Sequence, residues 1–265
     1  SGRGRQALGA AVPLFEGADA VVANLETPLC EEGAPIVKCG PAFQVSPSAA
    51  KRFAECGLSA FVMANNHIMD QGIEGLRRTL AALDEAGILH TGAALTHEDA
   101  CAPIVLERGG KRLAILNFAE GEFARAIGGG PGAARLDPWE SPERVRQARA
   151  ECDFVAAVLH TGNEYQPIPS PATVAAFRGM ARAGAHAVIG HHAHIPQAWE
   201  VWNGAPICYG LGNFLFGKAS PRPCWRLAEA AVLEFSAAGA TLTVHPLRQE
   251  GEGVLEVLSS PDRKV

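Results

Sequence analysis

The chain has 265 residues, of which 48% are hydrophobic and 19% are charged, and its formal net charge at pH 7 is −5. This composition is ordinary for a folded globular protein and excludes extensive disorder. The negative charge and the lack of a Lys/Arg cluster exclude a general affinity for nucleic acid, and no apolar run reaches the ~18 residues that a membrane span requires.

Strand and helix patterns alternate along the chain, and this alternation is typical of an α/β fold. The length fits one large domain or two small ones, and we expect a single domain over residues 1–265. In the first half we predict a strand at 20–23, a helix at 47–56 opened by Ser46-Pro47, a strand at 61–64, a helix at 72–86, and a hairpin with strands at 104–106 and 113–116 around Gly109-Gly110.

The second half continues the same alternation. We predict a helix at 143–151, a strand at 154–159, a helix at 171–183, and strands at 187–189, 207–209, 230–235 and 240–244. Glycines and prolines crowd residues 128–142, which indicates a mobile surface loop. The segment 119–137, with Glu120, Glu122 and Arg125, is a candidate substrate lid, although surface variability accounts for it equally well.

Seven cysteines are scattered along the chain without a CxxC pair, and an odd number cannot all be bridged within one chain. Reduced, mostly buried thiols are therefore expected, and they favour a cytoplasmic location. The chain opens with Ser1 rather than Met, so an upstream targeting segment or anchor stays an open alternative.

Polar residues of ligand type follow four of the apolar runs. They are Glu26, then Asn66 and His67, then His160 with Glu164, and finally His191, His192 and His194. The carboxyl ends of parallel strands meet along one edge of a sheet, so these residues are expected to converge there. Mixed nitrogen and oxygen donors suit one or two divalent ions such as Mn, Zn or Fe, with Glu26 as the best-placed bridging carboxylate.

Each of these residues also has a simpler explanation. A single histidine at a strand end, such as His160, is often a hydrogen-bonded structural residue, and Asn65 and Asn66 are suited to capping a following helix. Glu26 fits a solvated loop acid equally well. The alternate histidines His192 and His194 beside a glycine turn have few structural uses, and they favour the metal-binding interpretation. The remaining histidines (His90, His97, His186 and His245) lie outside the strand-end pattern and are interpreted as structural or exposed.

Six motifs in order resemble the CapA (poly-γ-glutamate capsule synthesis) family of the calcineurin-like metallophosphatase superfamily, over roughly residues 1–217. They are Ala23-Asn24-Leu25-Glu26-Thr27-Pro28, Ala64-Asn65-Asn66-His67, Asp70-x-Gly72-x-x-Gly75-Leu76, His160-Thr161-Gly162-x-Glu164, Gly190-His191-His192-Ala193-His194 and Tyr209-Gly210-Leu211-Gly212-Asn213-Phe214. The resemblance implies a four-layer α/β/β/α sandwich, metallophosphatase-like, with two central mixed sheets.

The resemblance also implies roles for individual residues. Glu26 resembles the metal-bridging acid, His194 a ligand of the first metal, and His67 the imidazole that protonates a leaving group. Ligands of the second metal are implied at Asn66, His160 and His192. Catalytic, substrate-binding or orienting roles are implied at Glu164, His191, Asn24, Asn65 and Asn213.

One departure from the family pattern concerns the first metal. The family opens with a strand ending in Gly-Asp ahead of a Gly-Arg pair, whereas Gly2-Arg3 stands at the start of this chain. Either the first strand and its aspartate lie upstream of residue 1, which we favour, or the site binds a single ion.

The leading functional prediction is a metal-dependent hydrolase that acts on a phosphoester or a glutamyl-type amide through a metal-activated water. A metal-dependent peptide epimerase and a non-catalytic scaffold subunit of poly-γ-glutamate synthesis are the alternatives. The expected substrate is small and anionic or peptide-like, and the oligomeric state is left open. Lys38 and Arg3 are candidate positive charges for it, although we favour their interpretation as ordinary solvated side chains.

Overall fold

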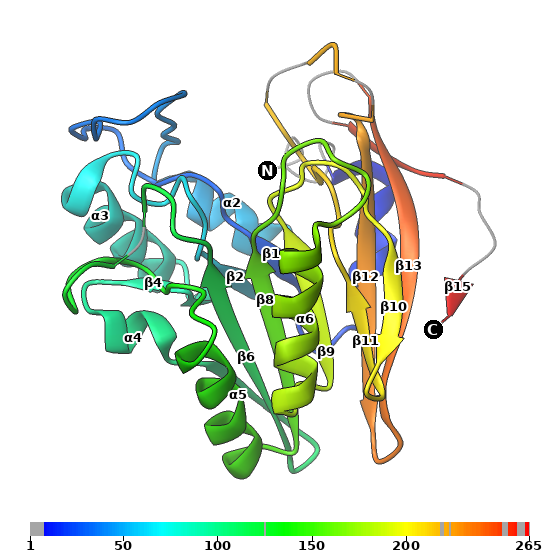
Figure 1. Ribbon diagram of the computed structural model, residues 1–265. Helices are drawn as coiled ribbons and strands as arrows, with labels where there is room; N and C mark the ends of the chain where they lie inside the picture. Colours follow the sequence, from blue (N-terminus) through cyan, green and yellow to red (C-terminus); the bar gives the residue numbers. More distant parts are fainter. Residues whose placement is uncertain are drawn as a thin grey trace.

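The computed structural model describes residues 8–124, 126–217, 220–222, 224–250, 254–258 and 263–264, so Arg3 and Arg125 lie outside the described residues. Strands and helices alternate as expected, and the α/β class is confirmed (Figure 1). The strands form a six-stranded sheet, a three-stranded sheet, a four-stranded sheet and a two-stranded ribbon. The prediction of four layers stays a prediction.

The six-stranded sheet is mixed and has the order β10-β11-β9-β8-β6-β5. Its four central strands are parallel, and the two edge strands run antiparallel to their neighbours. One face is covered by two helices, α5 (Glu140–Glu151) and α6 (Pro171–Ala183), whose apolar side chains form a single core with the sheet (Figure 1). The strands are β5 (Ile104–Arg108), β6 (Lys111–Ala119), β8 (Phe154–His160), β9 (Ala187–His191), β10 (Trp199–Trp202) and β11 (Ala205–Cys208).

The three-stranded sheet is parallel and alternates its side chains between two cores. It consists of β1 (Val22–Asn24), β2 (Ala60–Val62) and β3 (Leu89–Thr91). Ala60 and Val62 pack with side chains of the six-stranded sheet, whereas Phe61 packs on the other side with residues of α2 (Ala49–Glu55) and α3 (Gly72–Glu85). The period of two that defines a strand therefore brings the two sheets face to face.

The four-stranded sheet is antiparallel and packs on the face of the six-stranded sheet opposite α5 and α6. Leu242 and Val244 of this sheet share a core with Ile189 and Cys208. Its strands are β12 (Leu227–Ser236), β13 (Gly239–Glu250), β14 (Val254–Val257) and β15 (Arg263–Lys264). The remaining elements are the 3-10 helix η1 (Gly9–Phe15), the short helix α4 (His97–Cys101), and the ribbon of β4 (Ala93–Ala94) and β7 (Gly132–Ala133).

Local sequence signals set several boundaries. Helix α6 spans the predicted residues 171–183, because the Ser170 hydroxyl accepts the Thr173 N–H at its start and Gly184 adopts φ 112° at its end. The predicted hairpin is also confirmed, with Gly109 and Gly110 both at positive φ in the turn.

The predicted mobile loop at 128–142 is more ordered than expected. Residues 132–133 form β7, and α5 begins at Glu140 instead of residue 143. The helix starts early because the Asp137 carboxylate accepts the N–H groups of Trp139 and Glu140 at 2.9 Å each, which satisfies donors that a helix start leaves free. Helix α2 is shorter than predicted, because Ser46 and Pro47 form a turn ahead of Ala49.

Asn117 of β6 connects the two sheets just behind their carboxyl ends. Its buried side chain accepts the Ala64 N–H at 2.5 Å and donates to the Val158 carbonyl at 3.1 Å. The Asn117 side chain lies so close to Gly92 that this position has no room for a side chain. A Cβ there would lie 2.1 Å from Asn117 Oδ1. One amide therefore holds the segment after β2 against the end of β8.

All seven cysteines are free thiols, and five of them are buried, as expected. Among the described residues, the helices are too short or too polar to cross a bilayer.

We expect Asn117→Ala to lower the free energy of unfolding by about 1–3 kcal/mol, because it leaves the buried Ala64 N–H without its partner. Urea denaturation followed by tryptophan fluorescence measures the change. Gln147→Ala removes an exposed amide on α5 and serves as the control. Equal stability of the two variants would show that the amide link does not support the fold.

Candidate functional site

Imidazoles from two other strand ends lie close to one oxygen, Glu26 Oε1. Glu26 follows β1, and its Oε1 lies 3.7 Å from His160 Nε2 and 3.8 Å from His194 Nε2. This oxygen is buried and has no hydrogen-bond partner among the described residues. Because a buried carboxylate oxygen without a partner is costly, the arrangement has the form of a site that a cation completes.

The second group of donors surrounds the Nε2 atom of His160. Asn66 Oδ1 lies 3.1 Å from this nitrogen and His192 Nδ1 lies 3.2 Å from it. All three side chains are buried. Burial, together with the neighbouring His192, lowers the pKa of His160 well below its usual value. His160 therefore offers a neutral imidazole, the form that binds metals.

His192 and His194 lie in a tight turn after β9 with positive φ angles of 92° and 58°. Residues other than glycine rarely adopt such angles, because the Cβ crowds the backbone. The turn brings both rings to the same side, with centroids 6.2 Å apart. Strain of this kind is concentrated at functional sites, where surrounding contacts maintain it.

Three asparagine side chains hydrogen-bond to the metal-ligand candidates or to the loop that carries them, and so fix their orientation. Asn24 donates to Glu26 Oε2 at 2.8 Å, and Asn65 donates to the Leu25 carbonyl at 2.8 Å, so the loop after β1 is fixed to the segment after β2. Asn213 Oδ1 accepts from His194 Nδ1 at 2.9 Å, which turns Nε2 toward Glu26. Hydrogen bonds of this type fix the tautomer and the direction of a ligand.

Glu120 contacts the site although sequence reasoning placed it only in a candidate lid. Its Oε1 lies 3.2 Å from His192 Nε2, and its Oε2 accepts from Thr161 Oγ1 at 2.6 Å. Burial tends to lower the pKa of His192, but the hydrogen bond and charge of Glu120 outweigh it, and the pKa is raised. Glu120, Glu122 and His192 form a further group of donor atoms, which lie within 4.8 Å of one another. The position of Glu120 directly after β6 was the available signal.

His67 sits beside the donors and is held from one side by Asp70. Its Nδ1 lies 2.7 Å from Asp70 Oδ2 and 3.1 Å from Lys38 Nζ, and Lys38 also pairs with Asp70. The Phe43 ring lies at 4.5 Å from the imidazole centroid. Since Nδ1 is engaged, Nε2 is the nitrogen available for proton transfer. Lys38, which we expected to be a solvated side chain and named as a candidate charge for the substrate, is instead buried in this ion pair.

Glu164 and His191 lie at the margin of the cluster. Glu164 is exposed, and its Oε1 is 4.0 Å from His194 Nε2. His191 ends β9 beside His160 in the sheet, and burial together with His194 lowers its pKa to about 4. The structure thus links the other nine predicted residues through a chain of pairwise contacts and leaves these two at the edge.

The aromatic ring of Tyr165 borders His194, and the sequence did not indicate this contact. The Tyr165 ring stacks on the imidazole at 5.6 Å, and the Arg222 guanidinium lies 3.9 Å above the Tyr165 ring. Arg222 is exposed and supplies a positive charge close to the donor atoms.

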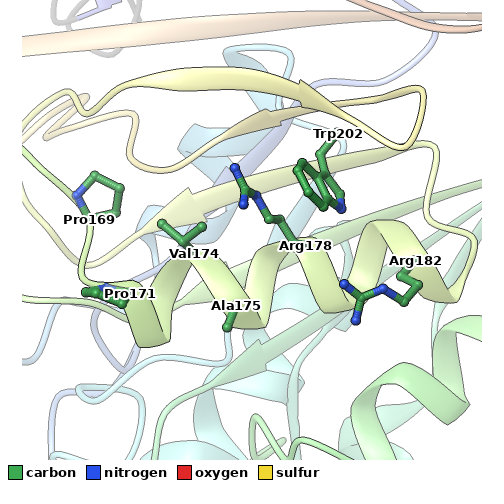
Figure 2. A pocket seen from close by; sticks show the side chains of 7 residues that line it. All are labelled: Pro169, Pro171, Val174, Ala175, Arg178, Arg182 and Trp202. Carbon is green, nitrogen blue, oxygen red and sulfur yellow. The ribbon is translucent and has the colours of Figure 1, made fainter.

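A surface hollow of about 570 Å³ lies elsewhere, along α6 (Figure 2). In it the Arg178 guanidinium stacks at 3.8 Å on Trp202 and pairs with Glu200. None of the strand-end residues lines this hollow. Its lining is fully explained by packing between α6 and β10.

The donor set fits a divalent ion of the Mn, Fe or Zn type. It contains imidazole nitrogens, an amide oxygen and carboxylate oxygens, and no thiol, which matches ions of intermediate softness. One ion could be held by His160, His192, Asn66 and Glu26. A second ion could take two of its ligands from His194 and Glu26.

Comparison with known sequences places the chain among capsule synthesis proteins. The model of the family described as "Bacterial capsule synthesis protein PGA_cap" matches residues 2–218. The chain is 29% identical over 256 residues to "Capsule biosynthesis protein CapA" of Bacillus anthracis, covering 93% of this chain and 59% of that protein. It is 28% identical over 250 residues to "PGA biosynthesis protein CapA" of Bacillus subtilis, covering 92% and 62%.

A third relative and one solved structure extend the comparison. A "Probable polyglutamine synthesis accessory protein" of Mycobacterium tuberculosis is 28% identical over 212 residues, which cover 74% of this chain and 55% of that protein. The crystal structure of a novel phosphatase from Mycoplasma pneumoniae has a TM-score of 0.51 at 14% identity, covering 98% of this chain and 90% of that chain. The predicted metallophosphatase-like fold is thereby confirmed. The chain spans about three fifths of the length of the two Bacillus relatives.

Acidification is expected to weaken the fold through Asp70. Burial raises the pKa of a carboxyl, but hydrogen bonds from His67 and Lys38 outweigh this and lower the pKa of Asp70 below 3.8. A lowered folded-state pKa contributes stability above pH 3.8 that is lost as the pH falls through the folded value. We expect Asp70→Asn to cost about 3–5 kcal/mol at pH 7, because Lys38 is left buried without its partner.

Urea denaturation over a pH series tests this expectation. The stability difference between wild type and Asp70→Asn should be constant above about pH 5 and narrow below pH 3.8. Asp84→Asn, which breaks the exposed pair with His90, should leave the profile unchanged. A difference that persists unchanged to the lowest pH would contradict the assignment.

Proposed function

Because the chain belongs to the bacterial capsule synthesis protein PGA_cap family, we propose that it is a metal-dependent hydrolase acting on a phosphoester or a glutamyl-type amide. The observation that carries the proposal is the buried Oε1 of Glu26, which has no partner among the described residues and faces imidazoles from two other strand ends. A structural role leaves this oxygen unexplained, whereas a divalent cation compensates its charge.

Each residue of the cluster has a role in this proposal. Glu26, Asn66, His160, His192 and His194 hold the metal, and Asn24, Asn65, Asn213 and Glu120 fix their directions. When bound, a divalent ion supplies Lewis acidity and a water of lowered pKa. His67 presents its Nε2 to the leaving group and donates the proton, while Asp70 holds the ring in one orientation through Nδ1.

The charges around the site favour an anionic substrate. Arg222 stacks on Tyr165 beside His194, and a guanidinium binds phosphate or carboxylate oxygens in a fixed geometry. Glu164 and His191 border the same region and are candidates for contacts to polar substrate groups. A phosphoester and a γ-linked glutamate both present the negative charge that Arg222 would bind.

An accessory role without turnover is the second candidate. The mycobacterial relative is described as a probable synthesis accessory protein, and this description favours a polymer-binding function. In that case the metal would hold the strand ends or bind the polymer without hydrolysis. The two candidates share the metal site and differ in whether His67 transfers a proton.

Glu26→Gln tests the metal site. Mn²⁺ at 100 times its dissociation constant should stabilise the wild type by about 2.7 kcal/mol, and the variant should lose this gain. With chelator present, the variant should be at least as stable as the wild type, because its side chain buries no unpaired charge. Thermal denaturation with and without Mn²⁺ measures both effects, with Glu85→Gln, an exposed acid at the end of α3, as the control. An equal metal response in all three proteins would exclude Glu26 as a ligand.

His67→Asn tests catalysis. We expect kcat on the responsive substrate, an aryl phosphate or a γ-glutamyl peptide, to fall by about 10²–10⁴-fold with unchanged metal content, because a general acid contributes that range. His90→Gln, which removes a histidine paired with Asp84 outside the site, should keep full activity. A wild type that binds metal and turns over neither substrate would support the accessory role instead.

A further inference from the structure

A second cluster of metal-ligand side chains lies between α4 and α5, on the helical side of the six-stranded sheet (Figure 1). His97 and Cys101 are four residues apart on α4, so they share one face of the helix. Glu140 is the first residue of α5 and faces them. The Thr96 side chain caps α4 by accepting the Asp99 N–H at 3.1 Å, which fixes the short helix.

The three donor atoms lie close together. His97 Nε2 lies 3.6 Å from Cys101 Sγ and 2.9 Å from Glu140 Oε1, and the three ligand atoms all lie within 4.8 Å of one another. In a tetrahedral zinc site, with bonds of about 2.0–2.3 Å, neighbouring donors are about 3.3–3.6 Å apart. The distances therefore fit a cation with only small movements of the side chains.

The geometry distinguishes this cluster from a thiol-based catalytic site. In a nucleophilic triad, one ring nitrogen faces the thiol and the other faces the carboxylate. Here the same nitrogen, Nε2, lies nearest to both the sulfur and the carboxylate oxygen. Cys101 is also only 3% exposed, so a substrate cannot reach it, whereas His97 and Glu140 are partly open to a water ligand.

The local charges suit a divalent ion. Arg144 pairs with both Glu98 and Glu140. The two carboxylates and the guanidinium therefore carry one net negative charge. Cys101 adds a second when it binds a metal as thiolate. Arg144 also donates to Glu140 Oε1 at 3.2 Å and so holds this carboxylate in place, as outer partners of metal ligands do.

We propose that His97, Cys101 and Glu140 form a binding site for a zinc-class divalent cation, separate from the strand-end site. Sulfur, imidazole and carboxylate together select Zn²⁺ or Co²⁺ over Mg²⁺ and Ca²⁺. The ion would join α4 to α5 and so fix the start of α5 against the sheet. This proposal does not depend on the proposed function, because the two sites share no residue.

Cobalt spectroscopy separates this site from the strand-end site. A thiolate bound to Co²⁺ gives a sulfur-to-metal charge-transfer absorption, and the strand-end donors contain no sulfur. The protein used is Cys39→Ser/Cys224→Ser, which lacks the two exposed thiols. We expect the absorption to appear with one equivalent of Co²⁺ at this site, to be displaced by Zn²⁺, and to persist when Glu26→Gln is added.

Two further variants decide the outcome. Cys101→Ser should abolish the absorption, and Cys152→Ser, which removes another buried thiol of the same core, should retain it. If Cys101→Ser does not fold, His97→Gln decides, with an expected loss of Co²⁺ affinity of at least about 100-fold. The proposal is overturned if the Cys39→Ser/Cys224→Ser protein gives no absorption, if Cys101→Ser retains it, or if His97→Gln binds Co²⁺ as tightly as its parent.

Discussion

The Asn117 side chain joins the two sheets that supply the strand-end site, and the geometry of the site depends on this link. Glu26 and Asn66 follow strands of the three-stranded sheet, whereas His160 ends a strand of the six-stranded sheet and His192 follows another. Donor atoms from separate sheets keep their distances only if the sheets cannot slide. A buried amide that bonds to both sheets provides this constraint better than apolar packing, because hydrogen bonds are directional.

The strand-end site concentrates polar groups that would be unfavourable elsewhere. Its imidazoles are buried, one carboxylate oxygen has no partner among the described residues, and two backbone positions are strained. A divalent cation, as proposed, would compensate the charge of the unpartnered Glu26 oxygen and bind the neutral imidazoles beside it. The fold offsets their cost with the large apolar cores on either side of the six-stranded sheet.

Much of this organisation could be predicted from the sequence. The run Phe154–Leu159 before His160 is long and apolar, and a shorter apolar run, Ala187–Ile189, precedes the histidine cluster, so both strand ends were recognisable. Ser170-Pro171 and Gly184 marked the ends of α6. The short strand β3 was not predicted, because its sequence Leu89-His90-Thr91 lacks the continuous apolar run that marked the equally short β1 and β2. Glu120 and Cys101 acquired their partners only through tertiary contacts with His192 and His97, which local patterns do not encode. The single-domain organisation stays a prediction.

The positive φ angles of His192 and His194 have a consequence for how mutants of the turn behave. Alanine at either position removes the ring but keeps a Cβ in a crowded conformation, so the turn is free to relax toward ordinary backbone angles and move its neighbour. Asparagine tolerates the left-handed region and changes the side chain alone. Loss of function in an alanine variant would therefore combine two effects, the rearranged backbone and the missing imidazole. The asparagine variant keeps the backbone conformation and so measures the effect of the missing imidazole alone.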